Sequence, residues 1–161
     1  MKRTAGRSTA AVIRVVAALA VALPFAAGLV APAAAGATRY APLNRPGPAL
    51  DVPAALLAKS LHCSANLRKS RHEPILLVPG TTVTPAVEFS WSYERAFNQL
   101  RLPWCAVTLP DSGMADIQTA GEYVVHAIRT MHAATHRKVQ IVGHSQGGMV
   151  PRWALRFWPD T

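Results

Sequence analysis

The feature that most constrains this chain is a Gly-x-Ser-x-Gly sequence at Gly143–Gly147. It follows a short apolar run at 138–142 and precedes a segment in which Val150, Ala154 and Phe157 recur at helical spacing. A strand that turns directly into a helix is the setting of a nucleophile elbow, in which the central serine stands exposed on a strained turn. The pattern therefore predicts that Ser145 is a catalytic nucleophile; a glycine-rich turn without chemistry is the alternative.

The residues around Ser145 have distinct expected roles in this elbow. We expect the elbow to require glycine at Gly143 and Gly147, because a Cβ at either position would collide with the neighbouring strand or helix. His144 adjoins the serine, but successive side chains diverge around so tight a turn. We therefore expect His144 to pack at the rim of the site and not to act as the base.

An acyl-transfer site also needs hydrogen-bond donors for the oxyanion that forms. One donor is expected to be the backbone N–H of Gln146, at the positive end of the helix that follows. The other is expected from the loop after the first sheet strand, Pro79–Thr82, with Thr81 offering its amide and its hydroxyl. The alternative for Thr81 is a capping role in a turn that ends the strand.

A serine nucleophile also needs a base, which in this kind of elbow protein follows the serine and the acid along the chain. After Ser145 the sequence contains Asp160 but no histidine. We therefore expect the triad acid and histidine to be absent from these residues and this chain to turn over little ester alone. His132 and His136 are four residues apart and could hold a metal, but a solvated helix end is the favoured interpretation, and no metal site is predicted.

The remaining pattern predicts an α/β fold. Continuous apolar runs at 75–78 and 104–109 are typical of strands buried on both faces of a parallel sheet. They alternate with helical spacing at 90–101 and 116–134, which indicates right-handed crossovers between parallel strands. We therefore predict an α/β-hydrolase-like parallel sheet with flanking helices over 74–161. The apolar faces of the two predicted helices comprise Tyr93, Phe97 and Leu100 in the first and Val124, Ile128 and Met131 in the second.

The N-terminal part of the chain reads as a targeting segment. Four basic residues precede an apolar run at 15–30, and small residues follow with cleavage expected near Ala35–Ala37. We predict a secretory signal peptide at 1–37 and a secreted protein; the alternative, an uncleaved anchor, is disfavoured by the short apolar run. Residues 38–73 are predicted to form an extended arm and a short helix at 53–61.

Composition narrows the class of partner. The chain carries 17 basic and 8 acidic residues, a net charge of +9, and removing 1–37 would leave 13 basic residues and a net charge of +5. The basic cluster at 68–71 has no interleaved aromatic residues and is expected to be a solvated loop, so no nucleic-acid partner is predicted. In an exported chain, Cys63 and Cys105 suggest one disulfide.

At these residues the sequence resembles the Candida antarctica lipase B type of α/β-hydrolase and its bacterial relatives. The similarity runs from about Leu61 to Asp160. It includes the strand and loop at 74–81, the cysteine pair, the Glu122-Tyr123 pair in the helix, and the Ser-Gln-Gly-Gly sequence at 145–148. It also includes Trp153 and the Phe-x-Pro sequence at 157–159.

The resemblance implies a serine esterase or lipase that acts on ester or lipid substrates, at a lipid–water interface, without a cofactor. It assigns the nucleophile to Ser145, the oxyanion hole to Thr81 and Gln146, and a disulfide to Cys63 and Cys105. The chain departs from the family at His144, where the yeast enzyme has tryptophan, and at Thr82, where it has glycine. The other functions that the sequence leaves open are an acyltransferase or thioesterase on the same fold and a non-catalytic lipid-binding or relic fragment.

Overall fold

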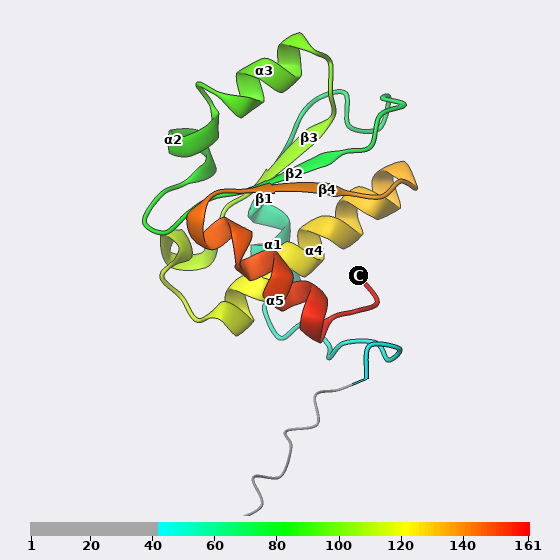
Figure 1. The fold of residues 1–161 in the computed structure, drawn as a ribbon, viewed down its shortest axis with the longest axis vertical. Coiled ribbons are helices and arrows are strands. Elements are labelled where there is room, and N and C mark those ends of the chain that lie inside the picture. The colour runs from blue at the N-terminus through cyan, green and yellow to red at the C-terminus, as the bar shows by residue number, and fades with distance from the viewer. Residues whose placement is uncertain (1–41) are drawn as a thin grey trace, which may run out of the picture. The chain divides into compact units, whose positions relative to one another are not determined.

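The computed structural model describes residues 42–161, and the strands in this range form one sheet in the order β1-β3-β2-β4 (Figure 1). The signal-peptide prediction for 1–37 lies outside the described residues. The helices and strands in chain order are α1 (Ala54–Lys59), β1 (Leu61–Cys63), β2 (Ile75–Val78), α2 (Pro85–Phe89), α3 (Tyr93–Gln99), β3 (Trp104–Val107), α4 (Ile117–Thr135), β4 (Gln140–Gly143) and α5 (Val150–Phe157). Short 3-10 turns, η1 (Pro110–Gly113) and η2 (Ser145–Gly148), follow β3 and β4.

The sheet is mixed: the strands within 74–161 are parallel, as predicted, and a short strand before this range joins them in the antiparallel direction. β2 runs parallel to both β3 and β4, as predicted, but β1 is antiparallel to β3. β1 is only three residues long and carries no apolar run, and only its first residue, Leu61, lies in the helix predicted at 53–61. A strand this short is defined by its pairing with β3 and not by its own pattern.

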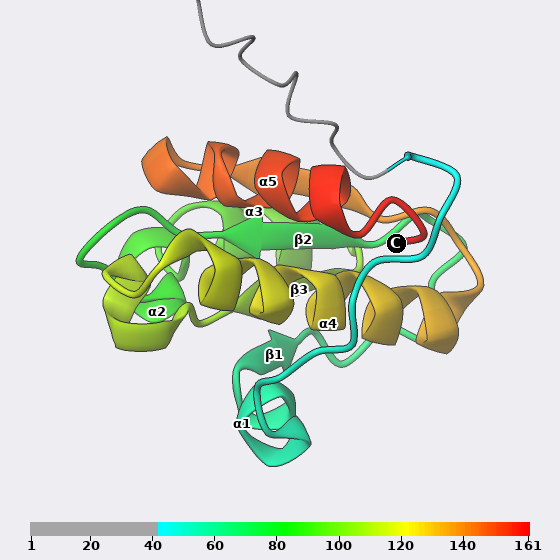
Figure 2. The same cartoon turned by 90° about the horizontal axis from the view of Figure 1, so that it is seen from below.

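Two hydrophobic clusters cover the two faces of the sheet. Successive side chains of a strand point to opposite faces, so Leu76 and Val78 of β2 join one cluster and Ile75 and Leu77 join the other. α4 and α5 supply the first cluster, and Phe89 at the end of α2 belongs to the second. Figures 1 and 2 show α4 and α5 on one side of the sheet and α2 and α3 on the other.

The helix predicted over 90–101 is shorter in the structure, where it is α3, and another short helix, α2, precedes it. α2 begins at Pro85, and its N-cap Thr84 accepts a hydrogen bond from the Val87 amide. α3 then ends at Gln99, so the predicted apolar face is only partly correct: Phe97 packs against the core, but Tyr93 is 46% and Leu100 66% exposed. The apolar spacing was real, but the helix is too short to bury its last member.

The long helix agrees closely with its prediction. α4 starts after Asp116, whose carboxylate accepts a hydrogen bond from the Thr119 amide, and its C-cap His136 adopts a left-handed conformation. The three predicted core positions, Val124, Ile128 and Met131, are all buried. Within 42–161, neither this helix nor any other has the length and apolarity needed to cross a bilayer.

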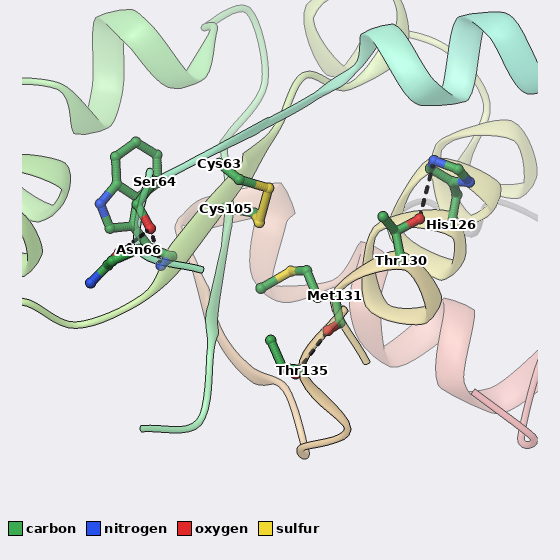
Figure 3. Close-up of a disulfide and its surroundings, with 9 residues drawn as sticks. Cys63, Ser64, Asn66, Cys105, His126, Thr130, Met131 and Thr135 are labelled. Atoms are coloured by element: carbon green, nitrogen blue, oxygen red, sulfur yellow. Dashed lines mark hydrogen bonds between the residues drawn. A yellow bond between two sulfur atoms is a disulfide. The ribbon is translucent and has the colours of Figure 1, made fainter. Parts of the chain in front are cut away.

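The predicted disulfide is present between Cys63 of β1 and Cys105 of β3. The two cysteines face each other in the antiparallel register, with their Cα atoms 4.0 Å apart. Figure 3 shows the bond beside α4, with Met131 pointing towards it. The covalent bond therefore attaches the short edge strand to the centre of the sheet.

Candidate active site

Ser145 stands on a strained turn at the carboxyl end of β4. Its φ is 52°, in the left-handed region that a residue with a side chain adopts only at a cost. A Cβ on Gly143 would lie 2.1 Å from the Gly147 carbonyl oxygen, and a Cβ on Gly147 would lie 2.1 Å from the Val78 carbonyl oxygen. Both distances are far below contact, so the turn can form only with glycine at these positions.

Three loops meet at this edge because β2, β3 and β4 are parallel and their carboxyl ends coincide. The loop after β2 brings Gly80 beside the elbow, where a Cβ on it would lie 3.3 Å from the Ser145 Cβ. The turn after β3 places Gly113 so that a Cβ would lie 2.6 Å from Oε1 of Gln146. The Thr82 amide donates to the Ser112 carbonyl at 2.7 Å, which joins the first two loops.

The two residues predicted to form the oxyanion hole contact each other through their side chains. The Thr81 hydroxyl donates to Oε1 of Gln146 at 3.1 Å, so the two residues are in direct contact. Among residues 42–161, neither the Thr81 amide nor the Gln146 amide donates a hydrogen bond to another group. Two free backbone donors next to a nucleophile are what stabilisation of an oxyanion requires.

His144 is held by a carboxylate that the sequence analysis did not single out. Its Nδ1 contacts Oε1 of Glu88, and Oε2 of the same carboxylate accepts a hydrogen bond from the Gly80 amide at 2.8 Å. The His144 side chain is 69% exposed, so it lies at the rim of the site without being packed there. Within the described residues, Ser145 forms no hydrogen bond with a histidine side chain.

The other histidines lie elsewhere. His132 contacts the Arg137 carbonyl oxygen, and His126 contacts Thr130 on the same helix, where burial lowers the pKa of His126. Neither lines the cavity beside Ser145. No group of three or more histidine, cysteine or acidic side chains in 42–161 is arranged to hold a metal ion.

A cavity of 280 Å³ opens beside the nucleophile. Its apolar wall comes from the β2–α2 loop, α2 and Trp91, and the Glu88–His144 pair also lines the cavity. Val87 and Trp91 on the apolar wall are 64% and 73% exposed. The apolar residues that line the cavity are Val83, Val87 and Trp91.

Two residues of the site were not predicted from the sequence. Gly113 belongs to a turn that was predicted, and its position after a parallel strand would have placed it at the same edge as the elbow. Glu88 had no comparable signal, because the short helix that carries it was not predicted. Its role depends on contacts with loops that lie eight and 56 residues away along the chain.

A serine elbow at the carboxyl edge of parallel strands, with helices on both faces, defines part of an α/β-hydrolase. No family model matches the sequence. Lipase B of Pseudozyma antarctica is 34% identical over 114 residues, which are 70% of this chain and 33% of that protein. The crystal structure of Aspergillus fumigatus lipase B superimposes with a TM-score of 0.66 at 28% identity, covering 76% of this chain and 30% of that one.

These similarities identify the chain as a relative of the lipase B type, which confirms the resemblance seen in the sequence. The chain spans about a third of the length of the relatives it matches. The fold is correspondingly part of an α/β-hydrolase, as predicted.

Proposed function

We propose that this chain carries the nucleophile and oxyanion hole of a carboxylic-ester hydrolase of the lipase or esterase type. The observation that carries the proposal is the pairing of Ser145 on its strained elbow with two free backbone amides, those of Thr81 and Gln146. The names of the two relatives, both lipases, support an ester or lipid as substrate. The exposed apolar wall beside Ser145 supports an apolar group on that substrate and contact with a lipid–water interface.

The proposed reaction proceeds through an acyl-enzyme. Oγ of Ser145 attacks the ester carbonyl carbon, and the carbonyl oxygen becomes an oxyanion that accepts hydrogen bonds from the amides of Thr81 and Gln146. The alcohol then leaves, and water attacks the acyl-enzyme to release the acid and regenerate the serine. No cofactor takes part in this scheme.

The expected rate of ester hydrolysis by this chain is low. No histidine side chain in 42–161 forms a hydrogen bond with Ser145, so the hydroxyl has no base in this part of the molecule. An oxyanion hole and substrate binding without a triad still accelerate acyl transfer by roughly 10³- to 10⁴-fold over water. A slow hydrolysis of activated esters that depends on Ser145 is therefore expected.

Replacement of Ser145 tests the proposal. We expect the full chain to hydrolyse p-nitrophenyl butyrate slowly and to be acylated once, and Ser145→Ala to lose both properties because the attacking oxygen is gone. Release of p-nitrophenol and the intact mass of the protein measure the two effects. The matched control is Ser112→Ala, in the turn after β3; equal hydrolysis by wild type and Ser145→Ala would refute the proposal.

We also propose that the protein is exported after cleavage near Ala35–Ala37. The disulfide supports an oxidising location, since such bonds persist outside the cytosol. The intact mass of protein recovered from the medium of the producing cells tests this directly. An N-terminus at Met1 in that protein would contradict cleavage.

A further inference from the structure

Glu88 is a carboxylate with an unusual position for a residue of a short surface helix. It lies in α2 next to Phe89, which is only 1% exposed and anchors the helix in the core against the sheet. The Glu88 side chain is itself 13% exposed and lines the cavity beside Ser145. The buried neighbour therefore holds the carboxylate facing the reaction centre and away from bulk solvent.

The two oxygens of this carboxylate contact two different loops. Oε2 accepts from the amide of Gly80, the residue before Thr81, and Oε1 contacts Nδ1 of His144, the residue before Ser145. Gly80 is buried, and the β2–β4 pairing ends two residues earlier, at Val78 on β2, where it meets Gly143 of β4. The carboxylate therefore joins the two loops where the sheet no longer does.

The chemistry of a carboxylate also constrains His144. An ionised carboxylate only accepts hydrogen bonds, so a neutral His144 ring must carry its proton on Nδ1 to bond Glu88. Nε2 is then an acceptor, and within 42–161 it has no hydrogen-bond partner. Hydrogen bonds to charged acceptors are stronger than neutral ones, which favours this tautomer and this ring position.

We propose that Glu88 is a positioning residue of the active site: it fixes the distance between the loop of Thr81 and the elbow of Ser145, and it sets the tautomer of His144 at the cavity wall. This inference rests on the proposed function, because positioning matters only if Ser145 and the two amides act on an ester. The contact between Thr81 and Gln146 joins the same loops at a second point. Glu88 supplies the only charged contact between these two loops among the described residues.

The contacts are tested by NMR spectroscopy on the full chain with Glu88→Ala, Glu88→Gln and Glu94→Ala. Glu94 is the matched control, since it is a partly buried glutamate on α3, on the same side of the sheet, that lines a different cavity. In Glu88→Ala we expect the Gly80 amide proton to move upfield, as its charged acceptor is lost. In Glu88→Gln the amide oxygen can still accept from Gly80, but the amide nitrogen donates to His144, so the His144 proton should move from Nδ1 to Nε2.

The positioning role is tested by kinetics with p-nitrophenyl butyrate below the unfolding temperature of each variant. We expect Glu88→Ala to lower kcat by roughly 10- to 100-fold with little change in KM, because the substrate still binds but the donors and nucleophile are misaligned. Glu88→Gln keeps the Gly80 contact and should recover kcat to within about fivefold of wild type. Glu94→Ala should match wild type.

Two results would overturn the inference. One is a kcat for Glu88→Ala that equals that of Glu94→Ala, and the other is unchanged Gly80 and His144 resonances in Glu88→Ala. If wild type shows no hydrolysis that depends on Ser145, the proposed function fails. The NMR resonances alone then test whether Glu88 connects the two loops. Shifts of both resonances in Glu88→Ala would support the connection between the loops, and unchanged resonances would reject it.

Discussion

At the scale of single residues, the elbow shows how identical amino acids differ in what they permit. Gly143, Gly147 and Gly148 lie within six positions of one another, yet a Cβ on either of the first two would overlap backbone oxygen atoms. A Cβ on Gly148 would meet nothing within 4 Å, and its φ is not in the left-handed region. The first two glycines are therefore required by close approach, and the third is not.

These environments predict opposite effects of alanine. Gly147→Ala should lower the free energy of unfolding by about 2–3 kcal/mol, because the β2 backbone must move away from the new methyl group. Gly148→Ala, the matched control, should be neutral or stabilising by about 0.5 kcal/mol, since alanine restricts the unfolded chain. Urea denaturation followed by circular dichroism measures both, and equal stabilities of the two variants would contradict the geometry of the turn.

At the scale of secondary-structure elements, the strength of the local pattern separates what was predicted from what was not. β2, β3 and α4 have long or continuous apolar patterns, and their existence and type were predicted correctly. β1 and α2 are only three and five residues long, too short to show a period, and both were missed. Each is held in place by a tertiary contact: β1 by its disulfide to β3, and α2 by the burial of Phe89 in the core.

The disulfide should contribute substantially to stability, since it closes a loop between cysteines 42 positions apart. The chain-entropy model gives about 4 kcal/mol for a loop of this length. We expect Cys63→Ala/Cys105→Ala to lose about that much free energy of unfolding in urea, because the unfolded chain is no longer constrained. The control is wild type unfolded in the presence of reductant, which should lose a similar amount; a loss below about 1 kcal/mol in both would contradict the estimate.

At the scale of the whole described region, distant parts of the chain are joined around α4 and α5. The Gly47 amide donates to Asp160 at 2.7 Å, the Trp158 indole donates to the Pro48 carbonyl at 2.8 Å, and the Val52 amide donates to the buried Glu122 at 2.8 Å. Figure 2 shows the segment before α1 passing near the C-terminal end of the chain and then crossing α4 to reach α1. The segment predicted as an extended arm is thus hydrogen-bonded to the helical layer.

Asp160 should make part of this attachment sensitive to acid. The hydrogen bond from the Gly47 amide, with smaller contributions from the backbone of Asp160 and the charge of Arg129, holds the pKa of Asp160 below its ordinary value of about 4. Because the pKa of Asp160 is lower in the folded state, its contribution to stability is fully present above the unfolded-state pKa. The contribution is lost as the pH falls through the lower, folded-state pKa.

We therefore expect Asp160→Asn to reduce the loss of thermal stability of wild type below about pH 4, because the variant has no carboxylate to protonate. Melting temperatures measured from pH 7 to pH 2 provide the test. The control is Asp51→Asn, in the segment before α1 that also contains Gly47. Parallel curves of melting temperature against pH for wild type and Asp160→Asn would contradict the assignment.

The amino-acid sequence was sufficient to predict the elbow, two central strands, the long helix and the candidate nucleophile. Those features depend on short-range sequence patterns: a continuous apolar run for a strand, two glycines at fixed spacing for the elbow, and apolar residues every three or four positions for the helix. The antiparallel pairing of β1, the close approach of Gly113 to Gln146 and the contacts of Glu88 emerge only in the folded molecule. Each of them joins residues far apart along the chain, and no local pattern specifies which distant backbone or side chain a carboxylate, a glycine or a short strand will meet.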